Sequence, residues 1–308
     1  MKRFEAAFAT WIVTHPWVVI ALSCALIAIP ATGLSNLYFD SSYRIYFGED
    51  NPQLADLEAI EATYTENHNV IIVVAPEDNE VFTAKTLQAI EELTDAAWQV
   101  PYARRVDSIT NFQYTTATED DVIVRDMVKG ASGLSDDELL EVKRAVLAEP
   151  ALINRLISSG GNVTGVNITL SMPEEELTTA TPTVANHARA AAAKLEADYP
   201  HLKTYISGVV MLDHSFSESA LRDFSFLVPV SFVLMMALIA ILVGGIAGTF
   251  VTMIIIITSV IAAMGTTGYI GFPLTAMSTS GPIIILTVAI ANCVHVLVSY
   301  VHGLRKGE

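Results

Sequence analysis

Gly281–Gly303, which reads GPIIILTVAIANCVHVLVSYVHG, is the most informative segment of this chain. It contains no Asp, Glu, Lys or Arg and is rich in Ile, Leu and Val. At about 1.5 Å of rise per residue, a helix of this length crosses the roughly 30 Å hydrocarbon core of a bilayer. The segment therefore predicts a membrane-spanning helix.

Polar residues recur inside this apolar segment at a helical spacing. Asn292, His295, Ser299 and His302 follow one another at intervals of three, four and three residues. This spacing places them on one narrow stripe of a helix. Because such a stripe gains nothing from contact with lipid, we expect it to face other helices, water or a moving ion.

Charge divides the rest of the chain into apolar ends and an acidic middle. The 308 residues have a net charge of −16 and a mean hydropathy of +0.46. The segment from Asp40 to Asp223 holds 13 basic and 31 acidic residues, and hence a net charge of −18. After Asp223 the next charged residue is Arg305. So acidic a segment argues against nucleic acid or an anionic membrane surface as its partner.

The apolar runs and the polar segments between them predict seven parts. These are an amphipathic N-terminal helix (1–16), a first span (17–34), a large polar domain (35–222), a second span (223–243), a third (249–270), a fourth (281–303) and a short end (304–308). Lys2 and Arg3 precede the first span, and Arg305 and Lys306 follow the fourth. Because positively charged flanks stay in the cytoplasm, we expect both ends of the chain inside and the acidic domain outside.

Strand and helix signals alternate in the polar domain. We expect strands at Val70–Ala75, Arg105–Ile109, Asn162–Leu170 and Lys203–Ser207, and helices at Thr83–Val100, Ser135–Ala148 and Thr183–Tyr199. Ser135 and the acidic residues after it are typical of a helix N-terminus. The order strand–helix–strand, insertion, strand–helix–strand predicts an α+β fold with helices on one face of a sheet.

Glycines in the apolar segments are candidates for helix packing. Gly244 and Gly248 lie four residues apart, and Gly265, Gly268 and Gly271 recur every three. Small residues let membrane helices approach closely, and they also permit the sliding that alternating access needs. The spacing does not separate these two uses.

No catalytic, metal or cofactor site is expected. His187, His201 and His214 lie far apart, and Cys24 and Cys293 both fall in apolar stretches, so metal-ligand spacing and a disulfide framework are missing. No glycine-rich phosphate loop is present either, which argues against direct use of ATP. An enzyme is thus the least expected class.

Several stretches resemble the resistance-nodulation-division (RND) transporters, and most closely their MMPL-like hydrophobe and lipid exporters, whose helix cluster is related to the sterol-sensing domain. The stretches are VFTAKTLQAIEEL with VDSITNF (Val81–Leu93, Val106–Phe112), which resembles a first porter unit, SGVVMLDHSFSESALRDFSFLVPVSF (Ser207–Phe232), which resembles the linker into a second helix, and LTVAIANCVHVLVSY (Leu286–Tyr300), which resembles a fourth helix. The resemblance implies an α-helical transmembrane bundle in the cell inner membrane. It also implies a periplasmic porter-like α+β domain with ferredoxin-like strand–helix–strand units.

The chain departs from this family in two ways. Such transporters consist of two repeats, and only one is recognisable here, so the resemblance implies an N-terminal half that needs a C-terminal half or a partner subunit. The fourth helix of many relatives carries an Asp that exchanges the transported proton, and Asn292 stands at that position. Asn292 is equally well explained by an interhelical hydrogen bond. His295 is the better candidate for proton exchange, because an unperturbed histidine titrates near pH 6.5. A neutral histidine bonded to a backbone carbonyl or to Ser299 is the alternative, and it stays open.

The resulting hypothesis is the export of hydrophobic or amphiphilic molecules such as lipids, driven by an ion gradient. The stripe Asn292/His295/Ser299 would couple ion movement to helix shifts, with Ser299 either a relay partner or a packing contact. Two alternatives stay open: a sterol-sensing-like module that binds a lipid without moving it, which the uncharged Asn292 favours, and an accessory subunit of a larger membrane complex. Self-association also stays open, and no nucleic-acid partner is expected.

Overall fold

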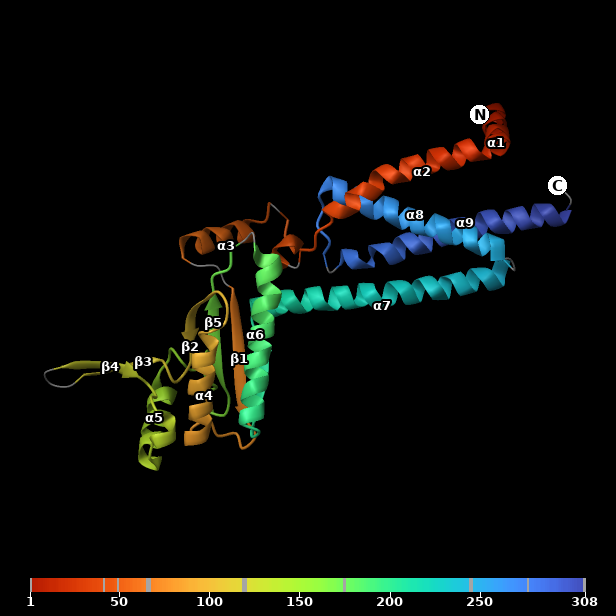
Figure 1. Cartoon of the computed structure of the whole chain (residues 1–308). Helices are drawn as coiled ribbons and strands as arrows, with labels where there is room; N and C mark the ends of the chain where they lie inside the picture. The colour runs from red at the N-terminus through yellow and green to blue at the C-terminus, as the bar shows by residue number, and fades with distance from the viewer. Residues whose placement is uncertain are drawn as a thin grey trace. The chain divides into compact units, whose positions relative to one another are not determined.

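The chain divides into two compact units. A computed structural model describes residues 2–40, 42–48, 50–64, 68–117, 121–173, 176–243, 246–275 and 277–306. Met1–Ser41 and Phe216–Glu308 form one unit, here called the membrane unit, and Ser42–Ser215 form the other, here called the α+β unit (Figure 1).

The α+β unit is built on a four-stranded antiparallel sheet with the strand order β2-β5-β1-β6. The strands are β1 (Asn69–Pro76), β2 (Ala103–Asp107), β5 (Thr164–Leu170) and β6 (Leu202–Ser207). In the central strand β1, Ile72 lies opposite Val166 of β5 on one side and Ile206 of β6 on the other. Strands β1 and β2 are not neighbours, and neither are β5 and β6. A helix therefore connects each pair across one face of the sheet.

The two connecting helices, α4 (Ala84–Ala97) and α6 (Leu177–Asp198), pack against the sheet and against each other. The side chains of Val70, Ile72 and Val74 alternate along β1 and are fully buried in this layer. Burying each of them contributes about 1.5–3 kcal/mol to folding. On the other face of the sheet, Ile71 and Val73 are only half-buried.

An insertion separates β2 from β5. It contains β3 (Gln113–Ala117), β4 (Val122–Asp126), the 3-10 turn η3 (Ala131–Gly133) and α5 (Asp136–Ala148). The strands β3 and β4 pair with each other and project from the unit as a hairpin (Figure 1). Helix α5 begins with a capping box, in which Ser135 Oγ accepts from the Glu138 amide and the Glu138 carboxylate accepts from the Ser135 amide.

The four predicted strands and three predicted helices of this domain are observed with boundaries shifted by a few residues. The hairpin was not predicted, nor were η2 (Tyr43–Tyr46) and α3 (Pro52–Thr63). The second predicted strand, Arg105–Ile109, lies at 103–107 instead, because Ser108, Thr110 and Asn111 form a hydrogen-bonded turn directly after it.

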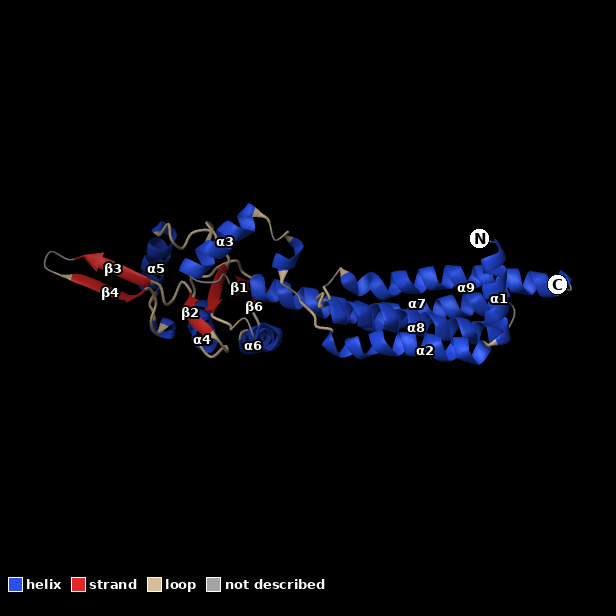
Figure 2. Cartoon of the chain, turned by 90° about the horizontal axis from the view of Figure 1, so that it is seen from above, coloured by secondary structure: helices blue, strands red, loops and turns tan. Residues whose placement is uncertain are grey.

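The membrane unit is helical. Its elements are α1 (Lys2–Thr14), α2 (Pro16–Thr32), η1 (Gly33–Asn36), most of α7 (Val209–Val243), α8 (Ile246–Ile270), η5 (Ser278–Ser280) and α9 (Gly281–Lys306). Among the described residues, four segments are long and apolar enough to cross a membrane: Pro16–Asn36, Val209–Ile241, Ile246–Ile270 and Ser278–Gly303. Helix α8 packs against α2 and against α9, and Figure 2 shows the long axes of α2, α7, α8 and α9 running in similar directions. The protein is therefore a multi-pass membrane protein.

The start of the polar domain at residue 35 stays a prediction. By its contacts, the chain after the first span lies in the membrane unit up to Ser41. The reason is a parallel bridge between Phe39 and Leu274. The Leu274 amide donates to the Tyr38 carbonyl, and the Asp40 amide donates to the Leu274 carbonyl, both at 2.8 Å. These bonds attach the segment that follows η1 to the loop that follows α8.

Candidate functional site

The polar stripe of α9 lies on an exposed face of that helix. Asn292, His295 and Ser299 are all exposed, as is His302 one turn further along. Ser299 Oγ donates to the His295 carbonyl at 2.9 Å, so this hydroxyl is satisfied within its own helix. The side chains of Asn292 and His295 make no hydrogen bond to the described residues. The stripe is thus exposed, and the described residues do not pack over it.

The opposite face of α9 packs on α8. Leu286 and Cys293 lie seven residues apart, two helical turns, and are 2% and 8% exposed. On α8, Thr252 is 1% exposed, and its hydroxyl donates to the carbonyl of Gly248 at 2.9 Å. Gly248, one of the predicted packing glycines, lies one helical turn before Thr252. The helix has one face for packing and another that carries its polar groups.

Gly265 and Gly268 lie where α8 meets α2. A Cβ added to Gly265 would lie 1.9 Å from the Pro30 carbonyl oxygen, and one added to Gly268 would lie 2.0 Å from that of Gly33. A Cβ on Gly33 would itself lie 2.2 Å from the Gly265 carbonyl oxygen. Only glycine fits at these three positions. Gly244, also predicted as a packing glycine, lies outside the described residues.

Sequence reasoning missed Gly33. It stands alone at the end of the first span, so no regular spacing of glycines marks it. Its partner residues lie far along the chain, and only the packing of α2 on α8 brings them together. Side-chain hydroxyls reinforce the contact, because Thr32 and Tyr269 hydrogen-bond each other and Tyr38 donates to the Gly271 carbonyl at 3.3 Å.

The stripe can support proton exchange through one kind of side chain only. Between Asp223 and Arg305 the sequence has no Asp, Glu, Lys or Arg and two histidines, His295 and His302. An imidazole can take up and release a proton near neutral pH, whereas the Asn292 amide can only donate and accept hydrogen bonds. Within the described residues, no three His, Cys, Asp or Glu side chains are placed to hold a metal ion.

Comparison with known proteins identifies one family. The sequence model of the MMPL family matches residues 46–294, which include most of the α+β unit and extend through α8 into α9. None of the curated proteins compared with the chain matches it.

Proposed function

This chain belongs to the MMPL family, and on that premise we propose that it exports hydrophobic or amphiphilic molecules across the cell inner membrane. The energy source in this proposal is an ion gradient, with protons as the coupling ion. The observation that carries it is the extent of the match, because residues 46–294 include most of the α+β unit, all of α7 and α8, and the first half of α9.

We propose that the α+β unit is a periplasmic porter-like domain and that both ends of the chain are cytoplasmic. The strand order β2-β5-β1-β6, with its two helical crossovers, supports ferredoxin-like strand–helix–strand units. The basic residues before the first span and after the fourth support the orientation. In this arrangement the domain collects a lipid-like substrate outside the membrane.

His295 is the proposed proton carrier, with Asn292 and Ser299 as its polar neighbours on α9. The exposure of all three supports this role, because a carrier must be reached by water or by a partner group. The same exposure suits contact with a partner subunit or with a second copy of the chain.

The test is gradient-driven export by the intact protein in sealed vesicles. A fluorescent lipid-like substrate is followed with and without an imposed pH gradient, for the unmodified protein, His295→Ala and His302→Ala. We expect His295→Ala to lose the gradient-dependent part of export and His302→Ala, near the helix end, to retain it. Undiminished export by His295→Ala removes this residue from the mechanism, and export indifferent to the gradient removes ion coupling.

A second candidate function is a lipid-binding or sensing module. The absence of any carboxylate between Asp223 and Arg305 favours it, because membrane proton relays commonly use Asp or Glu. A sensing module would bind the fluorescent lipid equally well with or without the gradient and would not move it between the two sides of the vesicle.

A further inference from the structure

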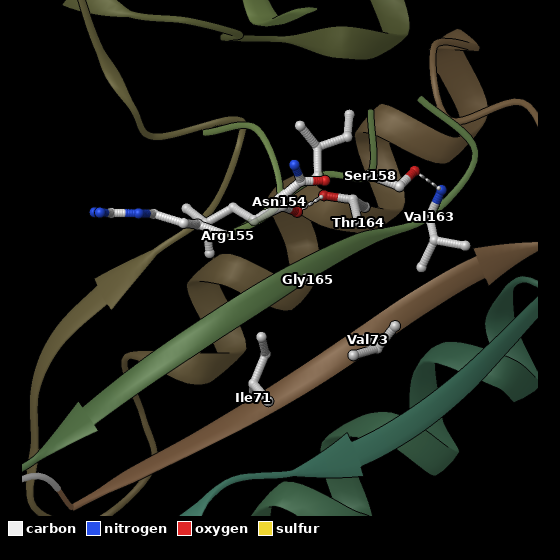
Figure 3. A pocket seen from close by; sticks show the side chains of 10 residues that line it. Ile71, Val73, Asn154, Arg155, Ser158, Val163, Thr164 and Gly165 are labelled. Carbon is white, nitrogen blue, oxygen red and sulfur yellow. Dashed lines mark hydrogen bonds between the residues drawn. The ribbon is translucent and has the colours of Figure 1, made fainter. Parts of the chain in front are cut away.

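The face of the sheet opposite α4 and α6 carries a pocket of about 210 Å³. Ile71 and Val73 of β1 and Gly165 of β5 form its floor, and the turn from Asn154 to Ser158 forms its wall. Figure 3 shows the side chains of Ile71 and Val73 rising from β1 toward this turn, with Arg155 extending along the margin. All lining residues belong to the α+β unit.

The pocket stays open because position 165 has no side chain. A Cβ on Gly165 would lie 3.0 Å from the Ile71 Cδ1 atom, so any larger side chain would enter the floor. The wall is held by its own hydrogen bonds. Thr164 Oγ1 donates to the Leu156 carbonyl at 2.8 Å, and Ser158 Oγ accepts from the Val163 amide at 3.1 Å (Figure 3). The cavity is therefore part of the folded unit.

The charge around the pocket differs from that of its unit. The acidic segment of the chain carries a net charge of −18, yet the 24 residues Pro150–Pro173 contain no Asp or Glu and one cation, Arg155. Arg155 is exposed and forms no ion pair with the described residues. On the adjoining strand, Asp107 is paired with Arg105 at 2.8 Å. Glu149, six positions before Arg155, is the nearest acidic residue in the sequence, and its carboxylate accepts a hydrogen bond from the Ala151 amide at 3.1 Å. An anion repelled by the rest of the unit would meet the exposed guanidinium of Arg155 here.

We propose that this pocket binds an anionic amphiphile, holding a segment of its apolar chain on Ile71, Val73 and Gly165 while Arg155 pairs with its carboxylate or phosphate head. The volume is below the roughly 300–1,000 Å³ of sites that enclose a whole small ligand, so the rest of the chain lies outside the pocket. The inference rests on the proposed function in one respect: if the chain is an exporter, the bound amphiphile is a substrate on its path through the α+β unit.

The test uses a photoreactive alkyl carboxylate and the full chain in zwitterionic nanodiscs. Peptide mapping by mass spectrometry locates the label, which we expect within residues 150–173. Competition then separates the contribution of the anionic head from that of the alkyl chain. A non-photoreactive alkyl carboxylate and an alkyl phosphate should displace the probe, and the alkanol of the same length should displace it more weakly. Acetate and inorganic phosphate, which lack the chain, should not displace it.

Two variants and a matched control test the residues. Arg155→Gln should weaken binding of the alkyl carboxylate about threefold to fivefold, the effect of losing a partly exposed ion pair. Arg144→Gln removes an exposed arginine of α5 that does not line the pocket and should change nothing. Gly165→Leu should abolish labelling by filling the floor. Because Arg155 is exposed, its variant tests the proposal even if Gly165→Leu fails to fold.

Three results would overturn the proposal: labelling confined to the apolar helices, equal binding by Arg155→Gln and Arg144→Gln, or full competition by acetate or inorganic phosphate. Failure of this inference differs from failure of the export function. Specific labelling without gradient-driven export leaves the pocket standing and removes export. Export that depends on His295 without labelling of residues 150–173 supports the export function and removes the pocket.

Discussion

Gly265 of α8 lies so close to Pro30 of α2 that a Cβ on Gly265 would come within 1.9 Å of the Pro30 carbonyl oxygen. The contact repeats one turn away between Gly268 and Gly33. Because lipid removes the hydrophobic drive for helices to associate, close van der Waals packing has to hold such a pair together. Helices α2 and α8 are thus a fixed pair, whereas the stripe of α9 lies on an exposed face.

Gly265→Ala should destabilise the membrane unit. The added methyl group overlaps a backbone oxygen that cannot rotate away, so the two helices must separate, at a cost of about 1–3 kcal/mol. Thermal unfolding of the purified protein in detergent measures the effect. The control is Gly303→Ala on α9, where a Cβ meets nothing within 4 Å. Both variants replace a helical glycine by alanine and so gain helix propensity alike, which leaves the steric overlap as the difference between them. Equal unfolding temperatures for the two variants would contradict the close packing.

Cysteines placed on the stripe should react with a water-soluble maleimide faster than the native Cys293. In a Cys24→Ser background, Ser299→Cys presents an exposed thiol, whereas Cys293 is 8% exposed at the α8 interface. Thiols react as thiolates and need water, so a stripe that lines an ion path should be labelled readily. Val296→Cys, exposed but off the stripe, is the control and should react slowly if it faces lipid. The same labelling rate at 296 and 299 would count against a hydrated path.

Asn69→Ala should loosen the start of α7. Asn69 Oδ1 accepts from the Val209 amide at 3.2 Å, and its Nδ2 donates to Asn167 Oδ1 at 3.0 Å, so one side chain joins the sheet to the first turn of a spanning helix. Loss of these bonds should cost about 1–2 kcal/mol and speed hydrogen exchange at Val209.

Gln88→Ala is the matched control for Asn69→Ala. Gln88 bonds only Glu92 of its own helix among the described residues, so its removal should leave exchange at Val209 unchanged. If Asn69→Ala and Gln88→Ala exchange alike at Val209, the Asn69 cap does not stabilise α7.

Acid should open helix α5 through Glu138. Hydrogen bonds from the Ser135 amide and hydroxyl lower the pKa of Glu138 below its ordinary value of 4.5. A carboxyl group with a lowered folded-state pKa stabilises the fold above the unfolded-state value and loses that contribution as the pH falls through the folded-state value. The protection of the α5 amides against hydrogen exchange, corrected for the intrinsic exchange rate at each pH, should therefore fall as the pH drops below the ordinary glutamate value of 4.5.

The matched variant for this acid response is Glu138→Gln. It keeps a side chain that can accept a hydrogen bond but removes the titrating group, so the loss of protection at low pH should be smaller than in the unmodified protein. An identical pH profile for both would show that Glu138 does not set the acid sensitivity of α5.

Much of the fold follows from local patterns. The apolar run at 70–75 predicts β1, and the serine and acidic residues at 135–138 predict the start of α5, because periodicity and capping depend on near neighbours. The β3–β4 hairpin was not predicted, because it lacks such a local pattern. Val122, Ile123 and Val124 are all exposed, so no alternation of buried and exposed residues marks a strand.

Some features of the candidate site likewise follow from the sequence, and others depend on the tertiary structure. The common face of Asn292, His295 and Ser299 follows from helical spacing alone, as does the apolar length of each span. The meeting of Gly265 with Pro30 and Gly33, the burial of Cys293 and not of His295, and the pocket between Ile71 and Gly165 depend on contacts between residues far apart in the chain. Spacing encodes which residues share a helix face, but the side to which that face turns is set by the packing of distant elements, and this is known only once the chain has folded.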